Sequence, residues 1–302
     1  MFKICISLKS MENVLHVPVL LKEVLEYLDP QEGNIVVDAT FGFGGHSEEI
    51  LKRIGKKGLL VAIEKDRDVF EKAHPRFKAK NIIFINEDFR NLSSILDRNK
   101  IRKVDRILFD LGVSSYHFDQ SGRGFSFLRD EPLDMRIDRS SGPTAADLIS
   151  GLTERELADL FYRLADERYS RRIAHEIVKS RKSRKINTTN DLVAIVERAK
   201  PKRGRIHSAT QVFQALRIAV NDELGALEEA LEGVSNLKKD GRMIVISFHS
   251  GEDRIVKKYF KNRAKSGQYQ ILTKKPVVAN HEEVKNNPRS RSAKLRAIKR
   301  LK

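Results

Sequence analysis

The chain has 302 residues, a formal net charge of +17 and a hydrophobic content of 40%. This composition excludes a chain that is disordered throughout, and no apolar run approaches the ~18 residues needed to span a bilayer. The charge does not indicate a fold, but it favours a polyanionic partner, such as nucleic acid or an acidic membrane surface.

The first residues contain the only cysteine of the chain, Cys5. A single cysteine cannot form an intramolecular disulfide, which is typical of proteins in a reducing cytoplasm. The apolar part of residues 1–10 is interrupted by Lys9 and lacks a small-residue cleavage site, which argues against a signal peptide. We therefore expect a cytoplasmic protein with a disordered leader over residues 1–10, and Met11 is an alternative start.

Apolar residues of helical period over 17–28 precede the first predicted strand, residues 35–37. Asp38 ends this strand, and a glycine-rich turn and the start of a helix follow. The turn contains Gly42, Gly44 and Gly45. A turn of this kind lets the backbone approach a ligand closely, and the helix start favours electron-rich ligand atoms.

The glycine spacing does not fit a dinucleotide site well, because the fingerprint G-x-G-x-x-G needs a third glycine where this chain has Ser47. The pattern acidic-x-x-x-G-x-G-G is closer to the S-adenosylmethionine loop of Rossmann-like methyltransferases. An ordinary strand–turn–helix unit, whose glycines serve only the backbone geometry, is the alternative. The loop by itself does not decide between the two interpretations.

Three further strands are predicted, and they alternate with helices. They cover residues 59–63, 82–85 and 106–110. This alternation is typical of a parallel sheet covered on both faces, whose ligands bind at the carboxyl ends of the strands. Glu64, Asp88, Phe89 and Asp110 stand at those ends. Glu64 ends the second strand, where an acid can accept hydrogen bonds from both ribose hydroxyls of a nucleoside.

The alternation breaks over residues 116–206, where helical patterns dominate and no parallel strand is indicated. A helical insert of this length predicts a second, smaller domain. The sheet pattern returns with a long helix over 212–231 and a strand over 243–248, and residues 292–298 could form a last strand.

We therefore predict an α/β fold in which an α-helical domain is inserted into a parallel sheet domain. The sheet domain comprises residues 11–115 and 207–302, and the inserted domain comprises residues 116–206.

Basic residues gather in the insert and at the carboxyl end of the chain, where residues 285–302 contain eight Lys or Arg and no acid. A run of charge is usually a solvated face, but several basic clusters together favour phosphate contact. The candidates for RNA binding are Arg181, Lys182, Arg184, Lys185 and Arg203.

Seven motifs, which run from about Val17 to Leu301, resemble those of the bacterial MraW family in sequence and in order. They are VDATFGFGGHS, DLGVSS, RGFSF, PLDMRID, FQALRIAVNDEL, ISFHSGEDRIVK and NPRSRSAKLR. The resemblance implies a Rossmann-like methyltransferase sheet whose inserted α-helical domain we expect to face RNA. It also implies an S-adenosylmethionine-dependent enzyme that methylates the N4 amine of a cytosine in 16S rRNA, at the decoding centre of the small ribosomal subunit. It leaves the oligomeric state open, and a homodimer is compatible with it.

The resemblance also implies a set of cofactor contacts. They are Gly44, Gly45, His46, Glu64, Phe89, Asp110 and His117. The family usually has Asp in place of Glu64 and Gln in place of His117. The extra methylene of Glu64 changes the reach of its carboxylate, and His117 can gain charge. At Gly44 we expect any side chain to enter the path of the cofactor.

The N4 amine of cytosine is a poor nucleophile, because its lone pair is delocalised into the ring. A hydrogen-bond acceptor beside the amine favours the pyramidal, nucleophilic form as charge develops. Asp110 is the candidate for this role or for holding the cofactor, and capping of the next turn is the alternative. Methylation at C5 would need a cysteine nucleophile, for which Cys5 is poorly placed.

Other assignments are weaker. His249 and Asp253 have helical spacing, but no third ligand is recognisable, so we predict no metal site. Tyr116, Phe125 and Phe127 could stack on a flipped base, and core packing is their alternative role.

Two further functions stay open: a methyltransferase that acts on DNA or protein, and a basic RNA-binding assembly factor without catalysis. Binding of S-adenosylmethionine separates the assembly factor from the enzymes, because a factor without catalysis need not bind the cofactor.

Overall fold

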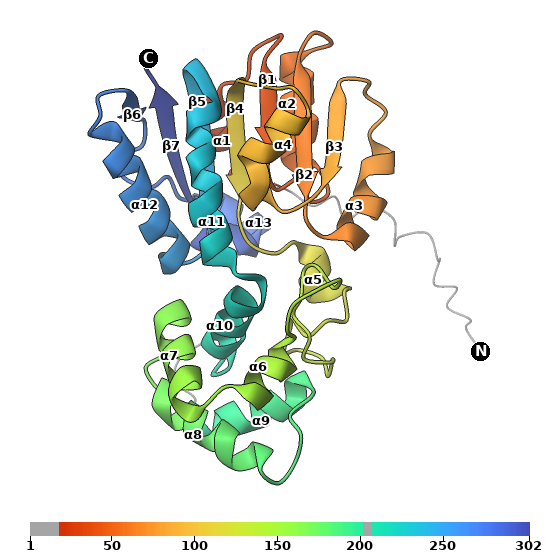
Figure 1. The fold of residues 1–302 in the computed structure, drawn as a ribbon, viewed down its shortest axis with the longest axis vertical. Coiled ribbons are helices and arrows are strands. Elements are labelled where there is room, and N and C mark those ends of the chain that lie inside the picture. The colour runs from red at the N-terminus through yellow and green to blue at the C-terminus, as the bar shows by residue number, and fades with distance from the viewer. Residues whose placement is uncertain (1–17, 202–206) are drawn as a thin grey trace, which may run out of the picture.

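The computed structural model describes residues 18–201 and 207–302, so the predicted leader and Arg203 lie outside the described residues. The chain forms a sheet lobe, built on strands β1–β7, and a helical lobe, built on helices α6–α10 (Figure 1). Two connections join the lobes, one from β4 to α5 and one from α10 to α11.

The sheet has seven strands in the order β3-β2-β1-β4-β5-β7-β6. They are β1 (Ile35–Asp38), β2 (Leu59–Glu64), β3 (Ile82–Asn86), β4 (Val104–Asp110), β5 (Leu237–Ser247), β6 (Tyr269–Ile271) and β7 (Lys294–Arg300). Strands β3, β2, β1, β4 and β5 are parallel, whereas β7 is antiparallel to β5 and β6 is antiparallel to β7. The predicted α/β class and the positions of the first four strands are confirmed.

Two apolar cores cover the two faces of this sheet, and consecutive residues of one strand enter different cores. Val36 packs with α1 and α2, whereas Val37 packs with α4, α11 and α12. These helices are α1 (Leu21–Leu28), α2 (Gly45–Ile54), α4 (Leu92–Arg98), α11 (Glu223–Leu231) and α12 (Ser250–Ala264). Because both faces are covered, the central parts of the parallel strands are continuous apolar runs, such as residues 35–37 in β1 and 59–63 in β2.

The helical lobe has one apolar core, to which Phe161, Ile177, Leu192 and Leu216 belong. Its helices are α6 (Ala145–Gly151), α7 (Glu154–Ala165), α8 (Ser170–Arg181), α9 (Thr189–Ala199) and α10 (Thr210–Asn221). Helices α6, α7 and α9 each begin after a threonine that forms a capping box with an acid three residues later. Capping satisfies amides that have no partner within the helix, and therefore fixes where these helices begin.

The predicted long helix over 212–231 is wrong, because the structure has two helices there. Asp222 adopts a left-handed conformation with φ of 48°, which ends α10, and α11 follows at once. Helix α10 packs in the helical lobe and α11 packs on the sheet. The predicted return to the sheet domain at residue 207 is therefore wrong for α10, since a pattern of apolar residues does not indicate which core they enter.

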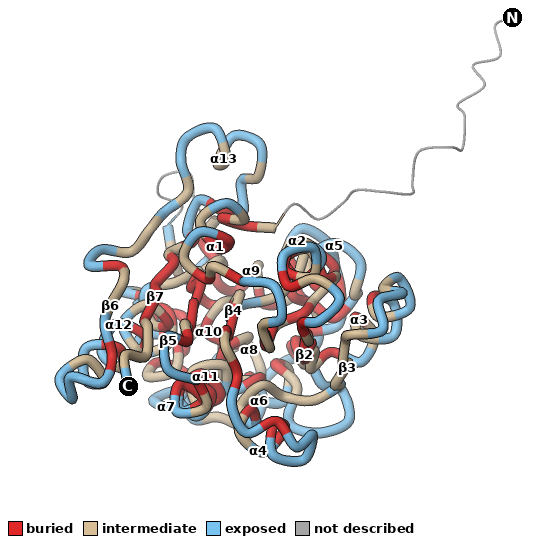
Figure 2. The backbone as a smooth tube through the Cα atoms, turned by 90° about the horizontal axis from the view of Figure 1, so that it is seen from above, coloured by how far each residue is buried: buried red, intermediate tan, exposed pale blue. Residues whose placement is uncertain are grey.

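The carboxyl end of the chain also differs from prediction. Strand β5 begins six residues before the predicted strand at 243, because its first part contains exposed polar residues that do not resemble a buried strand. Strand β6 was not predicted, because it has only three residues. Part of the basic tail is β7, whose Leu295, Ala297 and Ile298 are buried. Figure 2 shows this burial along the strands, with exposed backbone at the surrounding turns.

The remaining short helices are α3 (Arg67–Ala73), α5 (Ser115–Asp119) and α13 (His281–Asn286). Within residues 18–201 and 207–302, none of the helices has the length and apolar character that crossing a membrane requires.

Candidate functional site

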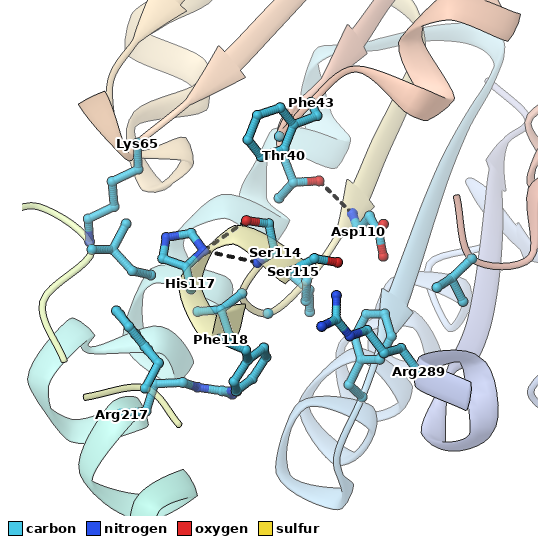
Figure 3. Close-up of a pocket in the computed structure, with 18 of the residues that line it drawn as sticks. Thr40, Phe43, Lys65, Asp110, Ser114, Ser115, His117, Phe118, Arg217 and Arg289 are labelled. Atoms are coloured by element: carbon cyan, nitrogen blue, oxygen red, sulfur yellow. Dashed lines mark hydrogen bonds between the residues drawn. The ribbon is translucent and has the colours of Figure 1, made fainter. Parts of the chain in front are cut away.

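A cavity of about 420 Å³ lies between the two lobes, at the carboxyl ends of β1, β2 and β4 (Figure 3). The sheet side of its wall includes Gly42, Gly45, His46, Glu64, Phe89 and Asp110. The opposite side includes His117, Phe118, Phe125, Phe127, Gln214, Arg217 and Arg289. This volume and this mixture of aromatic and polar groups are typical of small-molecule sites.

Six of the seven predicted cofactor residues line this single cavity. They are Gly45, His46, Glu64, Phe89, Asp110 and His117. Gly44 is not part of the wall. The structure thus brings the predicted residues together, and their roles in binding a cofactor stay predictions.

Hydrogen bonds to Asp38 fix the conformation of the glycine turn. Its buried carboxylate accepts hydrogen bonds from the Thr40 amide at 3.3 Å and the Ser47 hydroxyl at 2.6 Å. Burial raises the pKa of Asp38. The hydroxyl of Thr40 in turn accepts a hydrogen bond from the Asp110 amide at 2.6 Å, which ties the ends of β1 and β4 together (Figure 3).

Gly44 serves the packing of the turn on the sheet lobe. It has φ of 80°, and a Cβ added to it would lie 2.2 Å from Phe77 and 2.8 Å from Phe41. These rings form an edge-to-face pair with centroids 5.2 Å apart. A side chain at Gly44 would therefore collide with this aromatic pair, of which Phe41 also lines the cavity. That a side chain here would enter the path of the cofactor stays a prediction.

Glu64 is held at the end of β2 by two backbone amides. Its carboxylate accepts a hydrogen bond from Gly42 at 2.8 Å and another from Asp66 at 2.7 Å. Burial raises the pKa of Glu64 to about 7, despite these two hydrogen bonds. The predicted nucleoside-binding acid therefore titrates close to neutral pH.

His46 and Asp110 form the least satisfied polar pair in the wall. Nε2 of His46 lies 3.4 Å from Oδ2 of Asp110, and the side chain of His46 is buried. In the part of the chain that the structure describes, no hydrogen-bond partner reaches Oδ1 of Asp110 or either ring nitrogen of His46. Buried polar atoms without partners cost free energy, which a ligand at this position would recover.

His117 joins helix α5 to the end of β2. Its Nδ1 accepts a hydrogen bond from the Ser114 amide at 3.1 Å, so its Nε2 is the protonated nitrogen, which donates to Asp66 at 2.8 Å. Arg123 also donates to Asp66, at 2.7 Å. Burial raises the pKa of Asp66, but the hydrogen bonds from His117 and Arg123 outweigh it and lower the pKa overall. The ring of His117 lines the cavity while both its nitrogens contact the protein.

The three aromatic residues proposed to stack on a base differ in position. Phe125 and Phe127 line the cavity, whereas Tyr116 is buried and accepts a hydrogen bond from Lys72 at 2.8 Å. Phe127 stacks on His207, with ring centroids 4.6 Å apart. Core packing therefore accounts for Tyr116, and base stacking stays a prediction for Phe125 and Phe127.

A cluster of polar residues lies where α10, α11 and α12 meet. Glu223, His249 and Glu252 each place a potential ligand atom within 4.8 Å of the others. Arg217 donates to both carboxylate oxygens of Glu223, at 2.8 and 2.9 Å, so the chain supplies positive charge here. Asp253 instead accepts from an arginine of β7 at 2.6 Å. The two residues considered from their spacing thus have different partners, and the absence of a metal site stays a prediction.

The predicted RNA-binding run lies at the end of α8. Arg181 donates to the carbonyls of Ile149 and Leu152, at 2.6 and 2.7 Å, so it joins α8 to the end of α6. Lys182, Arg184 and Lys185 are exposed. Arg181 therefore has a structural role that the charge pattern did not indicate.

Sequence reasoning missed Gln214, Arg217 and Arg289 as residues of the wall. Gln214 and Arg217 are polar positions within the apolar pattern of α10, which is the signal that could have identified them. Arg289 pairs with Asp119 at 2.7 Å and lies 5.8 Å from the ring centre of Phe118. Figure 3 shows its guanidinium pointing into the cavity.

Known proteins are similar to this chain over almost its whole length. The model of the MraW methylase family matches residues 13–301. A protein of Dictyoglomus thermophilum named Ribosomal RNA small subunit methyltransferase H is 47% identical, over 96% of this chain and 99% of its own length. A protein of the same name from Wolbachia sp. subsp. Drosophila simulans is 48% identical, over 95% and 99% of the two chains.

Proposed function

The chain belongs to the MraW methylase family, and on that premise we propose that it transfers a methyl group from S-adenosylmethionine to the N4 amine of a cytosine in 16S rRNA of the small ribosomal subunit. The observation that most supports this chemistry is the buried, unpartnered Oδ1 of Asp110 in the wall of the cavity between the lobes. A cytoplasmic location belongs to the same proposal.

The sheet side of the cavity fits the cofactor. Glu64 offers a carboxylate for ribose hydroxyls, and Phe89 offers an apolar surface. Helix α2 begins at Gly45, and the amides of its first turn have no partner within the helix, so they can donate to the cofactor. When bound, S-adenosylmethionine supplies an electrophilic methyl group, so the enzyme needs no covalent group of its own.

The side of the cavity next to the helical lobe fits the acceptor base. Phe125 and Phe127 offer aromatic surface for a cytosine that has left its stack. Oδ1 of Asp110 then accepts a hydrogen bond from the N4 amine, which favours the pyramidal form as positive charge develops. The Thr40 hydroxyl accepts a hydrogen bond from the Asp110 amide, which fixes the backbone at the end of β4 before the base arrives, and Nε2 of His46 lies 3.4 Å from the other carboxylate oxygen.

Mass spectrometry of digested small-subunit RNA from a deletion strain, with and without the gene restored, tests the proposed function. We expect one cytidine to lose a methyl group on N4 in the deletion strain and to regain it on complementation. Unchanged RNA would favour DNA or protein as the acceptor. Calorimetric titration with S-adenosylmethionine distinguishes an enzyme from an assembly factor without catalysis, which need not bind the cofactor.

The titration of Glu64 predicts how cofactor affinity depends on pH. Its carboxylate must be ionised to accept from both ribose hydroxyls, and its pKa is about 7 in the free protein. Protonation therefore opposes binding below neutral pH, and we expect the Kd for S-adenosylmethionine to rise about tenfold from pH 8 to pH 6. Calorimetry at three pH values measures this change.

The matched control is Glu64→Gln, which cannot ionise and should bind weakly but without this pH dependence. Any effect of the cofactor's own titration on the Kd is the same for both proteins, so it cancels when their pH profiles are compared. Equal pH profiles of the two proteins would show that Glu64 does not contact the ribose as a carboxylate.

The exposed basic residues at the end of α8 predict the salt dependence of RNA binding. We propose that Lys182, Arg184 and Lys185 contact phosphates, and Arg203 belongs to the same proposal. Each neutralised phosphate adds about −0.7 to −0.9 to the log–log slope of affinity against salt. Replacing the three exposed residues by Gln should flatten this slope by about 2 and leave cofactor affinity unchanged.

Binding of small-subunit particles at several salt concentrations measures this slope. The control replaces Lys257, Lys258 and Lys261 by Gln, which removes the same charge from α12 in the sheet lobe. Equal flattening by both variants would indicate a general effect of net charge. Arg181 is left unchanged because its loss would break the contact between α8 and α6.

A further inference from the structure

Leu128 is the most exposed large hydrophobic side chain in the described residues, with 84% of its surface accessible. Single exposed hydrophobic residues are common on protein surfaces and usually need no explanation. The position of Leu128, and the rigidity of the loop that presents it, set it apart from an ordinary surface leucine.

The loop around Leu128 is fixed by hydrogen bonds on both sides. The amide of Leu128 donates to the Ser126 hydroxyl at 3.2 Å, and the guanidinium of Arg129 donates to the Phe118 carbonyl at 2.9 Å. The carbonyl of Arg129 accepts a hydrogen bond from the Thr189 hydroxyl at 2.7 Å. The exposure of Leu128 is therefore a property of an ordered loop, which holds an apolar side chain in water at one defined place.

The neighbours of Leu128 along the chain place it next to the cavity wall. Leu128 directly follows Phe127, which lines the cavity, and directly precedes Arg129, which is bonded to Phe118, another residue of the wall. Arg289 adjoins the same Phe118 ring, with its guanidinium 5.8 Å from the ring centre. One projecting apolar side chain thus lies near two guanidinium groups. Arg129 pairs with Glu131 at 3.1 Å and Arg289 with Asp119 at 2.7 Å, but their side chains stay 50% and 43% exposed. This combination is suited to a base stack flanked by phosphates.

We propose that Leu128 is a wedge that inserts into the RNA stack and fills the space left when the target cytosine enters the cavity. This inference rests on the proposed function. Moving a base out of its stack costs free energy, and proteins that distort nucleic acids often offset that cost with an inserted Leu, Met, Phe or Ile. The wedge contacts the bases next to the target, so Leu128 is a positioning residue and does not touch the reacting atoms.

The test measures methyl transfer to small ribosomal subunits from the deletion strain. We expect Leu128→Ala to lower kcat about tenfold and to leave the KM for the particle within about twofold, because the phosphate contacts that hold the particle stay intact. Leu128→Met, which keeps an apolar side chain of similar length, should retain most of the activity. Melting temperature and affinity for S-adenosylmethionine should match the wild type in both variants.

Tyr162→Ala is the matched control, because Tyr162 is 59% exposed on α7 and is not part of the cavity wall. It should have wild-type kcat. A Leu128→Ala protein with wild-type kcat, or a Leu128→Met protein as slow as the alanine variant, would overturn the wedge. Wild-type protein that leaves the subunits unmethylated would overturn the proposed function, and the wedge with it.

Discussion

Replacement of Asp110 by alanine is expected to lower the single-turnover rate of methyl transfer at least ~10²-fold, which is the typical cost of losing one preorganised polar contact in a transition state. Asp110 is the last residue of β4 and lines the cavity, and its carboxylate Oδ1 is buried without a partner among the described residues. In the alanine variant, nothing at this position accepts a hydrogen bond from the N4 amine.

The same variant separates two roles of Asp110. A purely cofactor-binding role predicts weaker affinity for S-adenosylmethionine and a normal rate at saturation, whereas a role toward the amine predicts a slow rate even at saturation. Single-turnover kinetics at several cofactor concentrations, together with calorimetric titration, distinguish them. A near wild-type rate and affinity would leave Asp110 with neither role.

Asp105 provides the control on the same strand. It lies near the opposite end of β4, where its carboxylate accepts hydrogen bonds from the Ile35 amide at 2.8 Å and from Lys238 at 2.9 Å. Asp105→Ala should therefore lower the free energy of unfolding and leave the methylation rate nearly unchanged. An equal loss of rate in both variants would mean that general damage to β4 is responsible.

The sequence predicts the sheet side of the site well for a physical reason. Parallel strands are short, apolar and ordered along the chain, so the residues that end them must meet at one edge of the sheet. Glu64, Phe89 and Asp110 are identified in this way, and all three line the cavity. His46 and His117 follow from the family resemblance, because no local pattern marks them.

Only part of the opposite side of the cavity, namely His117, Phe125 and Phe127, could be predicted, because contacts between distant segments form the rest. Arg289 contacts Asp119 across 170 residues of chain. Helix α10 also lines the cavity, and it ends at Asp222, where the sequence predicts a continuous helix. Charge patterns misled in a similar way at Arg181. A run of basic residues indicates solvent exposure on average, but the carbonyls that end α6 are visible only in the folded chain.

At Gly44 the structure indicates a consequence of substitution that the glycine motif does not. Its place in the glycine motif predicts that a side chain would block the cofactor and leave the fold largely intact. In the structure, the direction of the missing Cβ is toward Phe77 and Phe41 in the sheet lobe. The consequence of a substitution should therefore appear in stability as well as in cofactor binding.

Replacement of Gly44 by valine is expected to destabilise the protein by roughly 2–6 kcal/mol, as the sum of about 1–3 kcal/mol for a left-handed β-branched residue and a similar cost for overpacking. This is a large part of a typical stability of about 5–15 kcal/mol. The glycine turn that leads into α2 would shift as well, so binding of S-adenosylmethionine should be lost. Urea unfolding and calorimetric titration measure the two effects.

Gly33→Val is the matched control, because Gly33 has the same φ of 80° but no atom within 4 Å of the position that a Cβ would occupy. It should incur only the backbone cost of about 1–3 kcal/mol and should bind the cofactor normally. The excess destabilisation of Gly44→Val over Gly33→Val then measures the collision with Phe77 and Phe41. A Gly44→Val protein as stable as the wild type that had lost only cofactor affinity would instead mean that a side chain at Gly44 enters the path of the cofactor.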